Sequence, residues 1–306
     1  MNDVLLRAIA YIFMIFLGYT LKRVGFFAPG DYRIFSNVVM NITLPAAVIT
    51  SFASQEIDPA MIFIVLIGLG SNFVLLFISW LISSRRSKAT RVLYMLNIPG
   101  YNIGAFTMPF AQNFLGSLGV ATTSLFDTGN AFMVTGGTFA LVSRLLKNGK
   151  ATRLRDMLKI LRSSMPFLTY TTMLILIVFR LRVPTVVTSI TAPIGAANAF
   201  VAMMMIGLMF EIRPDPRSMK KAAVILLIRY VGAAVLSWIF YNLLPFSLPA
   251  RQALAVVVFS PISALSPTFT ERGEGDYALA SLINSLSIIL SLLIITGLII
   301  FLGIGT

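Results

Sequence analysis

Long runs of apolar residues recur along the whole chain and predict its secondary structure. Each run approaches the roughly 20 residues that a helix needs to cross the hydrocarbon core of a bilayer. Lipid requires every backbone polar group to be paired internally, and runs this long and this uniformly apolar exclude barrel strands. The sequence therefore predicts an all-α polytopic membrane protein with ten transmembrane helices. The predicted helices span residues 4–22, 35–54, 59–83, 90–114, 118–146, 163–181, 190–211, 219–243, 250–271 and 276–303.

Composition supports this prediction and excludes several kinds of chemistry. Of the 306 residues, 58% are hydrophobic and only 11% are charged. A soluble domain of this length cannot bury so much apolar surface. The chain has no cysteine and no histidine, which removes disulfides, thiol chemistry and most transition-metal sites. Because no nucleotide-binding loop or paired-carboxylate site is present either, we expect no enzyme, no metal site and no cofactor beyond a coupling ion, H⁺ or Na⁺.

Positive charges are distributed unevenly between the predicted loops. If the N-terminus lies outside, most of the 24 lysines and arginines fall in inside loops, as the positive-inside rule requires. The exceptions in the outside segments are Arg7, Arg180, Arg182 and Arg251. This distribution predicts a multi-pass protein with both termini outside. It also explains the net charge of +13 without a nucleic-acid partner.

The chain divides into two halves that share one plan. Residues 1–146 and 163–306 each contain five predicted helices, and a basic linker, 147–162, is expected to lie along the inner leaflet. In each half the fourth helix is broken by prolines and the fifth carries a polar residue mid-span, Asp127 or Asn284. Since five is an odd number, the second half must enter the membrane from the opposite side, which makes an inverted repeat. The alternative is that the prolines only kink ordinary membrane helices.

The two broken helices, 90–114 and 250–271, are the candidate substrate site. Proline frees a backbone carbonyl one turn earlier, and paired broken helices mark the midplane substrate site of inverted-repeat transporters. The positive ends of half-helices would favour a carboxylate there. The candidate substrate-binding residues, taken from these helices and from a proline motif in the second helix, are Asn102, Gly104, Pro109, Ser260, Pro261, Ser263, Pro267, Asn41 and Pro45.

Polar stripes on the fifth and tenth predicted helices are the candidate ion or proton site. Asp127 is the only acid deep in a predicted span, where a carboxylate is costly and usually functional. Asn130 lies one turn further along the same face, and Asn284 lies in the matching stripe of helix 276–303. The alternative for these polar residues is that they only form hydrogen bonds between helices.

Two further features allow structural interpretations. Arg229 lies inside predicted helix 219–243, where it could neutralise Asp127 or extend to the inner surface. The pair Gly136 and Gly137 is expected to mark a close contact between helices.

Short motifs in a fixed order resemble the auxin efflux carrier family over essentially the whole chain. They are Gly18–Gly25, Asn41–Pro45, Asn102 followed by Pro109 and Gly116, Phe126–Asn130, and Ser287–Ser291. The resemblance implies ten helices in two inverted repeats whose fourth and ninth helices break and cross. This fold is similar to that of plant PIN exporters and bile acid:sodium symporters. By position, Asn102, Pro109 and Pro267 match the family's crossover site.

The resemblance also implies a function. We expect a secondary active transporter of a small organic anion, such as a mono- or dicarboxylate, working by efflux or proton coupling. Helices three to five and eight to ten would move against helices one, two, six and seven in a homodimer of the bacterial cytoplasmic (inner) membrane, where lipid is a further partner. The alternatives are a sodium-coupled symporter of the bile-acid type, or less favoured, a channel or receptor.

Overall fold

The computed structural model describes residues 2–28, 30–54, 58–146, 154–209 and 216–304. These residues form helices and no strand, so the all-α prediction is confirmed. Large apolar side chains such as Phe16 and Trp238 are more than half exposed, as expected where lipid is the solvent. Five helical stretches within the described residues are long and apolar enough to cross a membrane. They are Tyr32–Ala53, Pro59–Ser83, Thr185–Met209, Ser218–Leu243 and Tyr277–Phe301.

The first half of the chain is a series of helices with several changes of winding. Its elements are α1 (Asn2–Arg23), α2 (Tyr32–Val38), η1 (Val39–Thr43), α3 (Leu44–Ala53), η2 (Pro59–Ile62), α4 (Phe63–Ser83), α5 (Lys88–Asn97), η3 (Ile103–Thr107), α6 (Met108–Phe110), η4 (Ala111–Leu115), α7 (Gly116–Phe132), η5 (Met133–Gly137) and α8 (Thr138–Leu145). The stretch predicted as one helix over 90–114 is therefore interrupted between α5 and η3.

The second half begins in the predicted linker. Residues 147–153 of that linker lie outside the described residues, and the remainder belongs to α9 (Leu154–Ser163). The helices that follow are α10 (Met165–Val178), α11 (Thr185–Ala196), α12 (Asn198–Met209), α13 (Pro216–Leu243), α14 (Leu248–Val257), α15 (Ser266–Arg272) and α16 (Tyr277–Phe301). Here too one predicted span, 250–271, is interrupted, between α14 and α15.

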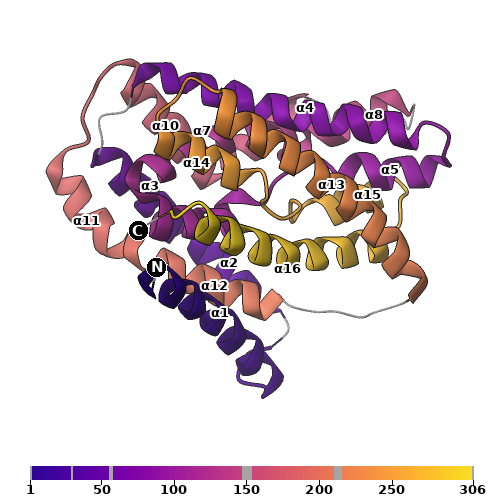
Figure 1. Ribbon diagram of the computed structural model, residues 1–306, viewed down its shortest axis with the longest axis horizontal. Coiled ribbons are helices and arrows are strands. Elements are labelled where there is room, and N and C mark those ends of the chain that lie inside the picture. The colour runs from indigo at the N-terminus through magenta and orange to yellow at the C-terminus, as the bar shows by residue number, and fades with distance from the viewer. Residues whose placement is uncertain (1, 29, 55–57, 147–153, 210–215, 305–306) are drawn as a thin grey trace.

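The helices pack in two groups. In one group α1 lies along α12 and α3 lies along α11, while in the other α4 lies along α7 and α13 along α14. Contacts of α7 with α3 and α10 join the groups. In Figure 1 the two chain ends and α11 lie at one end of the molecule, and α5, α8 and α15 lie at the other.

Glycines allow α4 and α7 to pack backbone against backbone. A methyl group added at Gly68 would lie 2.1 Å from the carbonyl oxygen of Phe126, and one added at Gly129 would lie 2.0 Å from that of Val65. Neither position can hold a larger residue unless the two helices separate. The close contact therefore fixes the position of α7 against α4.

Gly136 and Gly137 were expected to mark a close contact between helices, and the structure shows a kink at this pair. Gly136 has φ of 142°, which ends the regular winding of α7 and kinks the chain before α8. A methyl group on Gly137 would meet the carbonyl oxygen of Phe132 in the preceding turn at 2.7 Å, not a neighbouring helix. The pair serves the kink, because only glycine adopts such a φ readily.

Replacing Gly68 with alanine is expected to lower the free energy of unfolding by about 2 kcal/mol, since overpacking of a tight contact typically costs 1–3 kcal/mol. Gly70 on the same helix is the matched control, because nothing lies within 4 Å of an added methyl group there. Gly70→Ala should be neutral or slightly stabilising. Thermal unfolding of the purified protein in detergent compares the two variants. Equal melting temperatures would contradict the packing of α4 on α7.

Candidate functional site

The two interrupted stretches meet each other. Between α5 and η3 the chain leaves helical geometry after Asn97, in a segment that contains Pro99, and between α14 and α15 it does so after Val257, in a segment that contains Pro261. The backbone N–H of Asn102 donates to the carbonyl oxygen of Pro261 at 2.9 Å. Five residues further along, the hydroxyls of Thr107 and Ser260 lie 2.6 Å apart. We call residues 98–102 the first break and residues 258–265 the second break; they are in direct contact although they lie far apart in sequence.

Two buried asparagines hold the first break in place. The side-chain oxygen of Asn130 in α7 accepts from the N–H of Tyr101 at 3.1 Å, and its amide nitrogen donates to the Tyr101 carbonyl at 2.8 Å. In α4 the side-chain oxygen of Asn72 accepts from the N–H of Gly100 at 2.8 Å. Sequence reasoning missed Asn72, although an asparagine inside the apolar run 59–83 was a usable signal.

Two residues of α16 hold the second break in the same way. Ser287 accepts from the N–H of Ile262 at 3.0 Å, and the amide of Asn284 donates to the carbonyl of Ile262 at 3.0 Å and to that of Ser263 at 3.1 Å. The N–H and C=O of one residue in each break are thus both satisfied by side chains of one helix, α7 for the first break and α16 for the second. Asn130 does this alone for Tyr101, and two side chains one turn apart do it for Ile262.

Asp127 lies between the two groups of helices. Only 8% of its surface is exposed. One carboxylate oxygen accepts from the amide of Asn130 at 2.9 Å, and the other accepts from the hydroxyl of Tyr170 in α10 at 3.1 Å. A methyl group added at Gly104 would lie 3.6 Å from the Asp127 carboxylate, so this candidate substrate residue is its neighbour. No described lysine or arginine pairs with Asp127, and sequence reasoning missed Tyr170.

Arg229 follows neither of the two interpretations made from the sequence. Its side chain is fully buried, so it does not extend to the surface, and its partners do not include Asp127. Its guanidinium donates to the carbonyl oxygens of Ile98 in the first break and, at 2.8 and 3.2 Å, of Ser260 and Pro261 in the second. Three carbonyls that the breaks leave free hold the cation inside the protein.

The remaining candidate residues occupy different places in the fold. Pro267 begins α15 and Pro45 begins α3, each in the first turn of its helix. The carbonyl of Pro109 accepts from the hydroxyl of Tyr11 in α1 at 2.9 Å. Asn41 is not brought to the breaks by its side chain, which is exposed and donates to the carbonyl of Asn37 in its own helix.

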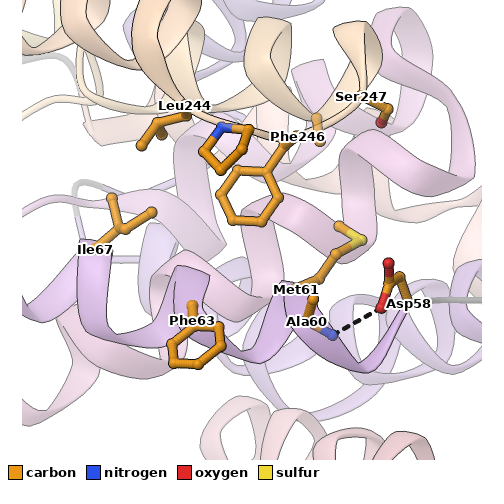
Figure 2. A pocket seen from close by; sticks show the side chains of 10 residues that line it. Asp58, Ala60, Met61, Phe63, Ile67, Leu244, Phe246 and Ser247 are labelled. Atoms are coloured by element: carbon orange, nitrogen blue, oxygen red, sulfur yellow. Dashed lines mark hydrogen bonds between the residues drawn. The ribbon is translucent and has the colours of Figure 1, made fainter.

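One small cavity lies at the breaks, and two larger pockets lie elsewhere in the described structure. A cavity of about 10 Å³ is lined by residues of both breaks, including Gly100 and Ser263, which is too little for an organic solute. Figure 2 shows a pocket of about 400 Å³ between η2 and the α13–α14 connection, with Phe246 above Met61 and with Asp58 accepting from the N–H of Ala60. A third pocket, of about 600 Å³, lies between α3 and α10 and is lined in part by Arg180 and Arg182.

Comparison with known families decides the general class of the protein. A family model described as membrane transport protein, the domain of auxin efflux carriers, matches residues 4–157, half of the chain. The chain belongs to the auxin efflux carrier family. A comparison with curated proteins found no match. The carrier is thus a multi-pass membrane transport protein, and the family resemblance is confirmed over residues 4–157.

The described part of the carrier contains no group of three or more acidic, histidine or cysteine side chains that could hold a metal ion. What it offers instead is a pair of contacting breaks with one buried cation and, beside the first break, one buried carboxylate. Such an arrangement offers charged and polar groups that can orient a small charged solute.

Proposed function

We propose that the carrier is a secondary active transporter of a small organic anion, such as a mono- or dicarboxylate, that works by alternating access around the two breaks. The observation that carries the proposal is the contact of the first break with the second through Asn102 and Pro261. Non-helical backbone at membrane depth is tolerated where it is buried in protein or lines a cavity, and in transporters built from repeats such breaks form the substrate site.

The architecture proposed for this function is ten membrane helices in two inverted five-helix repeats, with crossing at the breaks. The matched support of the breaks argues for it, since Asn130 holds Tyr101 as Asn284 and Ser287 hold Ile262. We also propose that both termini lie on one side of the membrane, in keeping with their common end in Figure 1, and that this side is the outside, in keeping with the distribution of lysine and arginine. A bacterial inner-membrane location and a homodimer formed through the helices that do not carry the breaks complete the proposal.

The two packing groups supply the parts that would move. The group containing α4, α5, α7, α8 and α13–α16 carries both breaks, and the group containing α1–α3 and α10–α12 would serve as the scaffold. The hydrogen bond from Tyr170 to Asp127 joins α10 to α7 and so crosses from one group to the other. Any movement of one group against the other must break it, which ties the carboxylate to the transport step. We therefore propose Asp127 as the coupling site, for a proton or for sodium.

Two further functions are kept as alternatives. A sodium-coupled symporter of the bile-acid type would require sodium for uptake, so replacing sodium with potassium separates it from proton coupling. A channel would give flux that does not saturate and shows no counterflow.

Asn102→Ala is expected to reduce saturable uptake about tenfold or more, because a lost hydrogen bond to a charged solute is worth about 1.5–3 kcal/mol. The measurement uses purified carrier in proteoliposomes, with labelled malonate, malate and indole-3-acetate tested one at a time. Pro109→Ala is the second variant, and Asn242→Ala is the control, because the exposed Asn242 amide donates only to the carbonyl of Trp238 in its own helix. Wild-type flux that neither saturates nor shows counterflow would overturn the proposal that the protein is a secondary transporter. Unchanged uptake in both Asn102→Ala and Pro109→Ala would overturn the assignment of the substrate site to the breaks.

A further inference from the structure

Arg229 in α13 is an unusual residue for the interior of a membrane protein. It has no exposed surface, and no carboxylate among the described residues pairs with it. Its partners are the carbonyls of Ile98, Ser260 and Pro261. In addition, the guanidinium carbon lies 5.1 Å from the centre of the Tyr101 ring, within the range of a cation–π interaction. Both breaks therefore contribute to the surroundings of one cation.

The carbonyls that hold Arg229 lie at the C-terminal end of α5 and in the non-helical segment that follows α14. Ile98 is the C-cap of α5, whereas Ser260 and Pro261 lie two and three residues beyond Val258, the C-cap of α14. A helix C-terminus carries roughly half a negative elementary charge on its free carbonyls. The end of α5 and the two carbonyls that follow α14 together stabilise the guanidinium, which explains how the arginine is buried without an acidic partner among the described residues.

We propose that Arg229 is the positioning and specificity-determining residue of the transport site: it clamps the two breaks together and gives the site its preference for anions. This inference rests on the proposed function. The carbonyl oxygen of Pro261 accepts both from Arg229, at 3.2 Å, and from the N–H of Asn102, at 2.9 Å. The cation is thus separated from the candidate substrate residue Asn102 by a single shared oxygen.

The charge of Arg229 matters even though no solute can touch it in this conformation. Without the guanidinium, the end of α5 and the two carbonyls that follow α14 would present their negative partial charges to the same buried space. Any anion bound near Asn102 would then be repelled, because charges interact strongly in a low-dielectric interior. With Arg229 in place these partial charges are neutralised, and the site can accept a carboxylate.

The clamp also needs the shape of arginine. The planar guanidinium presents several donors in a fixed fork and stacks on an aromatic ring, so it reaches carbonyls of both breaks and the Tyr101 face at once. A lysine would keep the charge but has a single nitrogen and no planar group. Lysine and glutamine at this position therefore separate the two roles.

The experiment compares Arg229→Lys and Arg229→Gln with the same changes at Arg251. Arg251 is a matched control because it also donates to a backbone carbonyl, that of Tyr241 at 2.9 Å, and lies 5.9 Å from the Tyr241 ring, yet it does not contact the breaks.

The first readout is hydrogen–deuterium exchange of the full-length carrier in detergent. Amides of residues 98–103 and 258–266 should exchange at least about tenfold faster in both Arg229 variants, and at wild-type rates in the Arg251 variants. Unchanged exchange in the Arg229 variants would overturn the clamp.

The second readout is the preference for malonate over its neutral analogue malonamide as inhibitors of uptake in proteoliposomes. Arg229→Lys should keep the preference while lowering the rate, and Arg229→Gln should reduce the preference at least about tenfold. A preference unchanged in Arg229→Gln, or lost equally in both variants, would overturn the electrostatic role. If Arg229→Gln does not fold, loss of the preference in Arg229→Lys overturns that role and its retention supports it. If the wild-type carrier transports no tested carboxylate, the proposed function and the anion preference fail together. Hydrogen–deuterium exchange still tests whether Arg229 holds the two breaks together.

Discussion

Asparagine in place of Asp127 is expected to abolish ion-driven accumulation of solute while leaving solute exchange intact. Asp127 is the carboxylate whose two oxygens accept from Asn130 in its own helix and from Tyr170 in the other group of helices. An amide has nearly the same shape but cannot take up or release a proton near neutral pH. A pH difference of one unit supplies about 1.4 kcal/mol per coupled proton, or about tenfold accumulation. The Asp127→Asn variant should lose this tenfold accumulation.

The measurement is uptake into proteoliposomes under an imposed pH or sodium gradient, compared with counterflow in the absence of a gradient. Asp276→Asn is the control, because Asp276 caps α16 by accepting from the N–H of Leu279, a role that asparagine also fills. Tyr170→Phe removes one donor but keeps the carboxylate, so it should change the rate and preserve coupling. Gradient-driven accumulation at the wild-type level in Asp127→Asn would exclude this residue as the coupling site.

Alanine in place of Asn130 is expected to destabilise the carrier by about 3 kcal/mol or more and to reduce transport by at least an order of magnitude. The change removes four hydrogen bonds, to the N–H and C=O of Tyr101, to Asp127 and to Asn72. Each buried backbone group left without a partner costs about 1–3 kcal/mol, and two are left at Tyr101. The first break would then lose its position relative to α7.

Thermal unfolding and uptake, measured on the same preparation, test this expectation. Asn242→Ala serves again as the control for removing an asparagine amide, since its only described bond stays within its own helix. A melting temperature for Asn130→Ala equal to that of the control would mean that the backbone of the first break does not depend on this side chain.

The membrane class and the position of the interruptions follow from sequence alone, because both depend on local properties. Runs of apolar residues determine which segments can be solvated by lipid, and Pro99 and Pro261 mark the two segments in which the chain leaves helical geometry. The pairing of Asp127 with Asn130 was likewise predictable, since residues three apart lie on one face of a helix. The family could be recognised for the same reason, from short local motifs.

Contacts between distant segments could not be predicted in this way. The neighbouring glycines Gly68 and Gly70 look alike in sequence, but only Gly68 meets the backbone of another helix. Gly136 and Gly137 suggested a helix contact and instead form a kink. The side chain of Asn41 matched a family motif, yet its amide remains within its own helix.

What the sequence by itself determined about this carrier is its class, its family and the residues that interrupt its helices. Only the tertiary structure decided what those interruptions contact: Asn72 and Tyr170 from helices with no special motif, and Arg229 from the middle of an apolar helix. The physical reason is that free carbonyls and N–H groups in a membrane protein must find partners inside the fold. The sequence shows where such groups arise, whereas the packing of helices decides which side chain is close enough to satisfy them.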